Sequence, residues 1–147
     1  MSPDITIAIA SDHGALDLKN HLRDILSQNN HVTIDDKGTH DENSVDYPDI
    51  AKTVVNDILD KKADLGILCC GTGIGISMKA NRYKGIRAAL VYDDFTAKMA
   101  KAHNNANILC LGGRTTDPKI AEQLVNTWLN TSFEEGRHQN RLDKLDQ

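Results

Sequence analysis

Short apolar runs rich in β-branched residues alternate with longer segments of helical period along this chain. Residues 5–10 (ITIAIA) have the composition of a strand, and Leu18, Leu22 and Ile25 then fall on one helix face because they are spaced by four and three residues. Further strands are expected at 31–34, 65–70, 88–92 and 108–111. Strand and helix alternate about five times, which predicts a parallel sheet covered by helices on both faces.

The helices between these strands have recognisable starts. Pro48 suits the first turn of one helix, a short helix is expected over 76–81, and Asp93 or Asp94 can cap a helix that runs to about 103. Another helix should begin at 116 or 117, and the charged tail 134–147 is expected to be partly helical. Without a linker or repeat, the 147 residues predict one three-layer α/β/α domain over 1–147, with a Rossmann-like sheet and a helical tail.

Composition excludes several classes of function. A net charge of -4 argues against a general nucleic-acid binder, which needs a basic surface. No apolar run approaches the roughly 20 residues that cross a bilayer, and residues 1–4 show no signal-peptide pattern. Three cysteines, two of them adjacent, are typical of reduced thiols, so a cytoplasmic protein is expected. The sequence has no CxxC or HExxH motif, so it does not indicate a metal or another cofactor.

Polar and glycine residues follow the predicted strands at the edge where open α/β sheets bind ligands. Asp12 and His13 follow the first strand, and Arg114 follows the last. The loop 71–75 (GTGIG) fails the GxGxxG pattern at Ile76 and lacks the GK[ST] of a Walker motif. Its backbone N–H groups can bind a single anionic oxygen, although a simple tight turn is the alternative reading.

Cys70 is the candidate base because it directly precedes this glycine loop. The N-terminus of a helix favours the thiolate form of a neighbouring cysteine. The alternative is a small core residue, which is the expected role of Cys69, on the opposite face of the strand, and of Cys110.

Two further groups lie towards the C-terminus. His103 stands at the end of a predicted helix, which would place it on the opposite rim of its own subunit, where it could serve a neighbour's site. Arg137 and Arg141 are four residues apart, so on a helix they share one face and could bind a phosphate together. The alternative is a solvated helix that pairs with acidic residues nearby.

The ordered set of motifs resembles type B ribose-5-phosphate isomerases, within the ribose/galactose phosphate isomerase family. The likeness covers nearly the whole chain. The matching segments are 11–14 (SDHG), 46–48 (DYP), 70–77 (CGTGIGIS), 80–81 (AN), 85–88 (GIRA), 103–104 (HN), 112–114 (GGR) and 136–141 (GRHQNR).

The resemblance implies an aldose–ketose isomerase that interconverts ribose 5-phosphate and ribulose 5-phosphate, a step of the pentose phosphate pathway, without metal or cofactor. It implies Cys70 as the base, Thr72 as its partner, and His103 for ring opening across a dimer interface, with Asp12 assisting. The implied substrate and phosphate positions are Asp12, His13, Tyr47, Gly71, Thr72, Gly73, Ile74, Gly75, Asn104, Arg114, Arg137 and Arg141. One branch of the family carries a glutamate where this chain has Ile76, so the chain resembles the cysteine branch.

Three alternatives stay open at this point. The substrate could be a hexose 6-phosphate such as allose or galactose 6-phosphate. The chain could instead be a nucleotide- or flavin-binding module, or a non-catalytic family member. The partners expected are a sugar phosphate and further copies of the chain, as a dimer or tetramer with a shared site, with no nucleic acid and no membrane.

Overall fold

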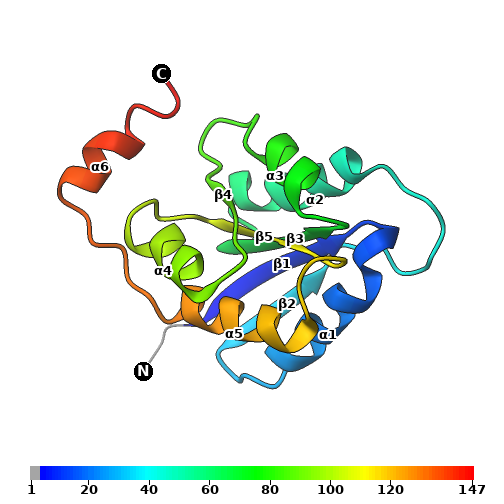
Figure 1. Cartoon of the computed structure of the whole chain (residues 1–147). Coiled ribbons are helices and arrows are strands. Elements are labelled where there is room, and N and C mark those ends of the chain that lie inside the picture. Colours follow the sequence, from blue (N-terminus) through cyan, green and yellow to red (C-terminus); the bar gives the residue numbers. More distant parts are fainter. Residues whose placement is uncertain (1–3) are drawn as a thin grey trace.

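The computed structural model, which describes residues 4–147, contains a five-stranded sheet in which every strand pair is parallel (Figure 1). The strands are β1 (Ile5–Ser11), β2 (Val32–Asp36), β3 (Leu65–Cys70), β4 (Ala88–Leu90) and β5 (Ile108–Gly112). Their order is β2-β1-β3-β5-β4. The chain therefore moves outward from β1 to β2 and then returns to build the other half from β3, which confirms the predicted Rossmann-like α/β class.

Helices cover both faces of this sheet (Figure 1). One face carries α1 (Leu16–Leu26), α4 (Asp94–Ala102) and α5 (Pro118–Leu129). The other carries α2 (Tyr47–Leu59) and α3 (Ile74–Ala80). A short 3-10 helix, η1 (His13–Ala15), precedes α1, and α6 (Arg137–Leu142) lies in the tail, out to one side of the sheet (Figure 1).

The two faces of the sheet bury two separate apolar clusters. Adjacent residues of β3 point into different ones: Cys69 packs with the α1, α4 and α5 cluster, and Cys70 with the α2 and α3 cluster. Successive side chains of a strand alternate between faces, so this separation was predictable from sequence. Cys69 and Cys110 are fully buried, which confirms that both are core residues.

Several element boundaries differ from those expected from sequence: β1 and β5 each run one residue further, to Ser11 and Gly112. β2 runs over 32–36 instead of 31–34, and β4 stops at Leu90 because the chain must reach Asp93, whose side chain caps α4. α3 begins at Ile74, two residues earlier than expected. Gly73 precedes it with φ of 80°, a left-handed conformation that lets the helix start directly after the strand.

Within residues 4–147, no helix is long and apolar enough to cross a membrane. Residues 1–3, part of the segment in which no signal-peptide pattern was found, lie outside the described residues.

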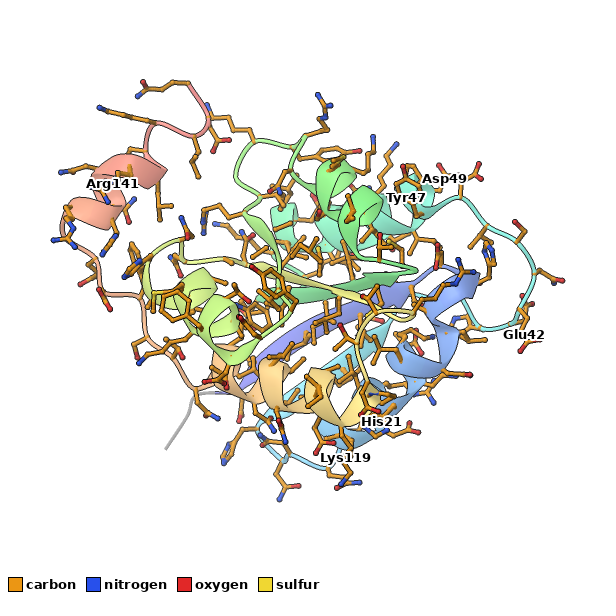
Figure 2. The ribbon with its side chains drawn as sticks, viewed as in Figure 1. His21, Glu42, Tyr47, Asp49, Lys119 and Arg141 are labelled. Atoms are coloured by element: carbon orange, nitrogen blue, oxygen red, sulfur yellow. The ribbon has the colours of Figure 1, made fainter. Side chains whose placement is uncertain are left out.

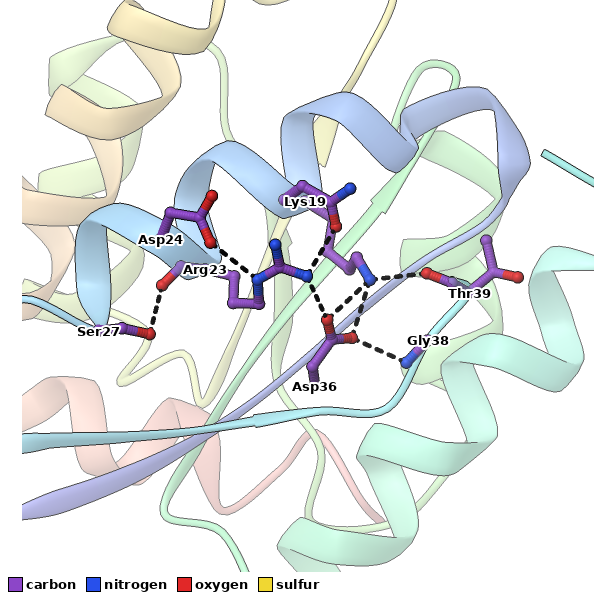
Figure 3. A network of polar contacts seen from close by, with 8 residues as sticks. Lys19, Arg23, Asp24, Ser27, Asp36, Gly38 and Thr39 are labelled. Carbon is purple, nitrogen blue, oxygen red and sulfur yellow. Dashed lines mark hydrogen bonds and ion pairs between the residues drawn. The ribbon is translucent and has the colours of Figure 1, made fainter. Parts of the chain in front are cut away.

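A buried ion pair joins α1 to the end of β2 (Figure 3). Lys19 of α1 is fully buried, and its Nζ lies 2.9 Å from both carboxylate oxygens of Asp36 and 2.6 Å from the Thr39 carbonyl oxygen. Burial raises the pKa of Asp36, but hydrogen bonds from Lys19, the Gly38 N–H and Arg23 outweigh it and leave the pKa below its ordinary value. The carboxylate is therefore charged at neutral pH, as a buried ammonium group requires.

Removing this ammonium should destabilise the fold strongly. We expect Lys19→Ala to lower the free energy of unfolding by about 2–3 kcal/mol, because the largely buried Asp36 carboxylate loses its closest cation and keeps only Arg23 and the Gly38 N–H. Urea denaturation measures the loss. The control is His31→Asn, which removes an exposed pair with Asp4 (side chains 42% and 86% exposed) and should change stability by less than about 1 kcal/mol. Equal losses in the two variants would contradict the assignment.

Candidate active site

The carboxyl ends of the three central strands lie at the same level. Ser11 at the end of β1 is level with Cys69 of β3, and Cys70 is level with Gly112 at the end of β5. Backbone hydrogen bonds continue past these ends, from the Gly113 N–H to the Cys70 carbonyl oxygen at 2.8 Å. The segments after β1, β3 and β5 are thus held against one another, at the edge where the sequence predicted a site.

Cys70 lies at the centre of this edge with 5% of its surface exposed. Its Sγ accepts a hydrogen bond from the Gly73 N–H at 3.1 Å, so the sulfur faces the glycine loop. The other two thiols differ in environment. Burial raises the pKa of both Cys69 and Cys110 well above the ordinary value, so these remain protonated at neutral pH.

The glycine loop folds into a tight, donor-rich turn. The Ile74 N–H donates to Thr72 Oγ1 at 3.2 Å, and the Gly73 N–H to sulfur. Within the described chain, the N–H groups of Thr72 and Gly75 have no acceptor. Donors of this kind can bind an oxyanion, which is the chemistry expected for loop 71–75.

Tyr47, the first residue of α2, covers the far end of the loop. A Cβ placed on Gly75 would stand 2.6 Å from the Tyr47 ring, so the ring occupies the space that a side chain would fill. Tyr47 keeps 40% of its surface exposed and can contact a ligand as well.

An acid, an imidazole and a guanidinium border the same edge. Asp12 is nearly buried and accepts from the Gly14 N–H at 3.0 Å, and His13 Nδ1 accepts from the Val45 N–H at 3.2 Å. Arg114 lies across the loops after β1 and β3: a Cβ on Gly14 would stand 3.3 Å from its guanidinium, and one on Gly71 would stand 3.4 Å away. The guanidinium thus places a positive charge beside the loop.

The remaining predicted site residues lie at the opposite edge of the sheet. His103 caps the C-terminus of α4, which runs antiparallel to the strands and ends where β5 begins, and Asn104 follows it. Arg137 and Arg141 both belong to α6. Figure 2 shows Arg141 and Tyr47 on opposite sides of the molecule. One chain therefore holds two separate groups: Asp12, His13, Tyr47, the 70–75 loop and Arg114 on one side, and His103, Asn104, Arg137 and Arg141 on the other.

Two residues beside His103 were not assigned by sequence reasoning. Glu134 Oε1 lies 3.6 Å from His103 Nε2 and 3.3 Å from His138 Nε2, and the two imidazole rings stack with centroids 4.2 Å apart. The only signal in the sequence is the four-residue spacing of Glu134 and His138, which is too common to be diagnostic.

A cavity of about 390 Å³ opens near this second group. Its lining includes Asn104, Arg87 and Asp146, with Leu145 from the tail. Burial lowers the pKa of Arg87, and the nearby Asp146 carboxylate opposes that change. The chain thus offers a cavity with a mixed polar and apolar lining at the edge that carries His103.

Comparison with known proteins places this chain in a family. The profile of the ribose/galactose isomerase family matches residues 7–145. The chain belongs to this family. Ribose-5-phosphate isomerase B of Escherichia coli is 37% identical over 139 residues, which cover 95% of this chain and 93% of that protein. D-erythrulose-4-phosphate isomerase of Pectobacterium atrosepticum is 40% identical over 143 residues, or 96% and 93% of the two chains.

The solved structures agree with the sequence relatives. A ribose 5-phosphate isomerase from Thermotoga maritima superposes with a TM-score of 0.94 and 51% identity, covering 97% of each chain. Membership of the family makes this chain a sugar phosphate isomerase, and it confirms the family resemblance and the enzyme class predicted from sequence. The roles of individual site residues stay predictions.

The close packing around Gly73 can be tested by measuring the free energy of unfolding of a variant. Gly73→Ala should lower the free energy of unfolding by about 2–4 kcal/mol, because the new Cβ would meet Leu90 Cδ1 at 2.6 Å and the Leu111 carbonyl carbon at 3.0 Å in addition to the left-handed strain. The control is Gly85→Ala, also at positive φ, where the nearest atom is 3.6 Å away; it should cost only the strain, about 1–2 kcal/mol. Chemical denaturation compares the two, and an equal cost would show that the loop has room to relax.

Proposed function

We propose that this enzyme interconverts ribose 5-phosphate and ribulose 5-phosphate through an enediolate, without a metal, with Cys70 as the base. The observation that supports this most directly is the Cys70 Sγ, which faces a loop with unpaired N–H donors. Aldose–ketose isomerisation moves a proton between C1 and C2, so it needs one base and one set of donors for the developing oxyanion. The names of the Escherichia coli and Thermotoga maritima relatives support the pentose phosphate.

The Cys70 thiolate removes the proton from C2 of the open-chain aldose and returns it to C1, with Thr72 beside it. Loop N–H groups from 71–75 hold the enediolate oxygen, and one such donor typically contributes about 3 kcal/mol. His103, assisted by Asp12, opens the sugar ring before this step.

The site is proposed to be shared between two copies of the chain. Cys70 and His103 lie at opposite edges of one sheet, so a single chain does not bring them together. In a twofold dimer the His103 edge of one copy can face the Cys70 edge of the other, which completes two equivalent sites. Arg137 and Arg141 lie on the His103 side and would bind the phosphate, while Asp12, His13, Tyr47, Asn104 and Arg114 would bind the sugar.

The cellular setting is proposed on the same basis. An enzyme for this reaction serves the pentose phosphate pathway in the cytoplasm, as a homodimer or a tetramer of such dimers.

A second candidate substrate is a tetrose 4-phosphate. The D-erythrulose-4-phosphate isomerase of Pectobacterium atrosepticum is 40% identical to this chain over nearly its whole length. This is slightly above the 37% identity of the Escherichia coli ribose-5-phosphate isomerase B. Turnover measured in parallel on tetrose, pentose and hexose phosphates, with a chelator present, decides among the three chain lengths. The pentose assignment fails if its kcat/KM is not the highest.

Replacing the proposed base should remove turnover and spare binding. We expect Cys70→Ala to lower kcat by about 10²–10⁴-fold with little change in KM, because the base acts only in the proton-transfer step. Cys69→Ala is the matched control, since it removes the adjacent sulfur from the other face of β3 and should keep kcat near the wild-type value. Normal turnover in Cys70→Ala would contradict the assignment of Cys70 as the base.

The ring-opening role of His103 can be separated from proton transfer by the substrate. Ribose 5-phosphate is mostly a closed ring, whereas erythrose 4-phosphate cannot form a furanose because its 4-oxygen carries the phosphate. His103→Asn should therefore reduce turnover of the pentose by about 10²-fold or more and leave turnover of the tetrose largely unchanged. Steady-state kinetics on both sugars measure this, and an equal loss on the two would assign His103 a different role.

Mixing two inactive variants tests the shared site. A hybrid dimer of Cys70→Ala and His103→Asn chains would have one doubly damaged site and one intact site. Random exchange of subunits should then restore about a quarter of the wild-type activity, since half the dimers are hybrids with one of two sites intact. If each chain formed its own site, every site would carry one lesion and the mixture would stay inactive.

A further inference from the structure

His103, Glu134 and His138 bring three metal-ligating side chains together at the base of the tail. Within residues 4–147 they form the one group of three such residues whose ligand atoms all lie within 4.8 Å of one another. They come from three separate positions in the fold: the end of α4, the segment before α6, and the first turn of α6. No sequence motif for metal binding connects them.

The spacing of the ligand atoms suits a small tetrahedral ion. Bonds of about 2.0–2.1 Å from zinc to nitrogen and oxygen put neighbouring ligand atoms about 3.4 Å apart. The Glu134 Oε1 lies 3.3 Å from His138 Nε2 and 3.6 Å from His103 Nε2, on either side of that value. Two imidazoles with one carboxylate form a ligand set preferred by zinc and similar transition metals, not by magnesium or calcium.

The surroundings hold the three groups in place and leave one side open. The Glu134 N–H donates to the Ala102 carbonyl oxygen at 2.9 Å, which fixes the backbone of the carboxylate. The His138 side chain is 8% exposed, whereas those of His103 and Glu134 are 39% and 55% exposed. The imidazole rings stack at an angle of 16°, and a metal ion binds in the plane of an imidazole ring, so the exposed His103 ring must turn about its side-chain bonds for both Nε2 atoms to face one ion. Water can complete the coordination from the open side.

We propose that His103, Glu134 and His138 bind one divalent transition-metal ion of the zinc class. Arg137 and Arg141 on the same short helix add positive charge, so affinity in the micromolar range is expected rather than the tighter binding of a structural zinc site. The site itself rests on geometry alone. A consequence rests on the proposed function: the ion occupies the imidazole assigned to ring opening, so it inhibits the isomerase reversibly.

The test is zinc binding to the full-length protein, after chelator treatment, in competition with a chromophoric chelator. One ion per chain is expected for the wild type. Glu134→Gln and His138→Asn should each weaken binding by about tenfold or more, because each removes one of three ligands. His21→Asn is the matched control, since His21 Nε2 lies 3.3 Å from Glu122 Oε2 elsewhere on the surface and this pair lacks a third ligand. Cys70→Ser controls for binding at the thiol.

The outcomes separate the metal site from the catalytic proposal. Failure of the wild type to bind zinc stoichiometrically would overturn the site. So would unchanged affinity in both Glu134→Gln and His138→Asn, or a loss confined to Cys70→Ser. If zinc binds as expected and inhibits the wild type but not Glu134→Gln, both the site and its consequence are supported. Stoichiometric binding without inhibition supports the site and contradicts the role of His103.

Discussion

The parallel pairing of β1, β3 and β5 is the constraint on which the rest of this structure depends. Parallel strands put all their carboxyl ends at one edge, and the register makes Cys70 level with Gly112 and Cys69 level with Ser11. Backbone hydrogen bonds then join the loops beyond those ends. Cys70 therefore lies at the same edge as Asp12 and Arg114, although about 60 and 40 residues of chain separate them, because three strands end together.

The same parallel arrangement places the second group of predicted site residues at the opposite edge of the sheet. Each crossover helix of a parallel sheet runs back towards the amino edge, so α4 delivers His103 there, and the tail that follows α5 places α6 nearby. The contacts among His103, Glu134 and His138 hold that tail against the end of α4. A fold that separates the two groups within one chain can unite them only between chains, which gives the proposed shared site a structural reason.

Close packing and one buried ion pair hold the loops around Cys70 in place. Gly73 and Gly75 admit no side chain, because Leu90, the Leu111 backbone and the Tyr47 ring fill the space. Lys19 binds Asp36 and the Thr39 carbonyl, and this fixes the segment after β2 beside the end of β1. A buried ion pair adds little net stability compared with apolar packing, but it is very sensitive to the loss of one partner.

The sequence by itself determined the fold class, the order of the elements, and the separation of Cys69 from Cys70, since these follow from periodicity and from the alternation of side chains along a strand. It also placed Asp12, His13, the 70–75 loop and Arg114 at one edge, because the ends of neighbouring parallel strands must meet. Only the tertiary structure revealed that Tyr47 covers Gly75, that Lys19 is buried on Asp36, and that Glu134 and His138 surround His103. These contacts depend on where helices and the tail pack, and packing distances between segments far apart in the chain are not encoded in any local spacing.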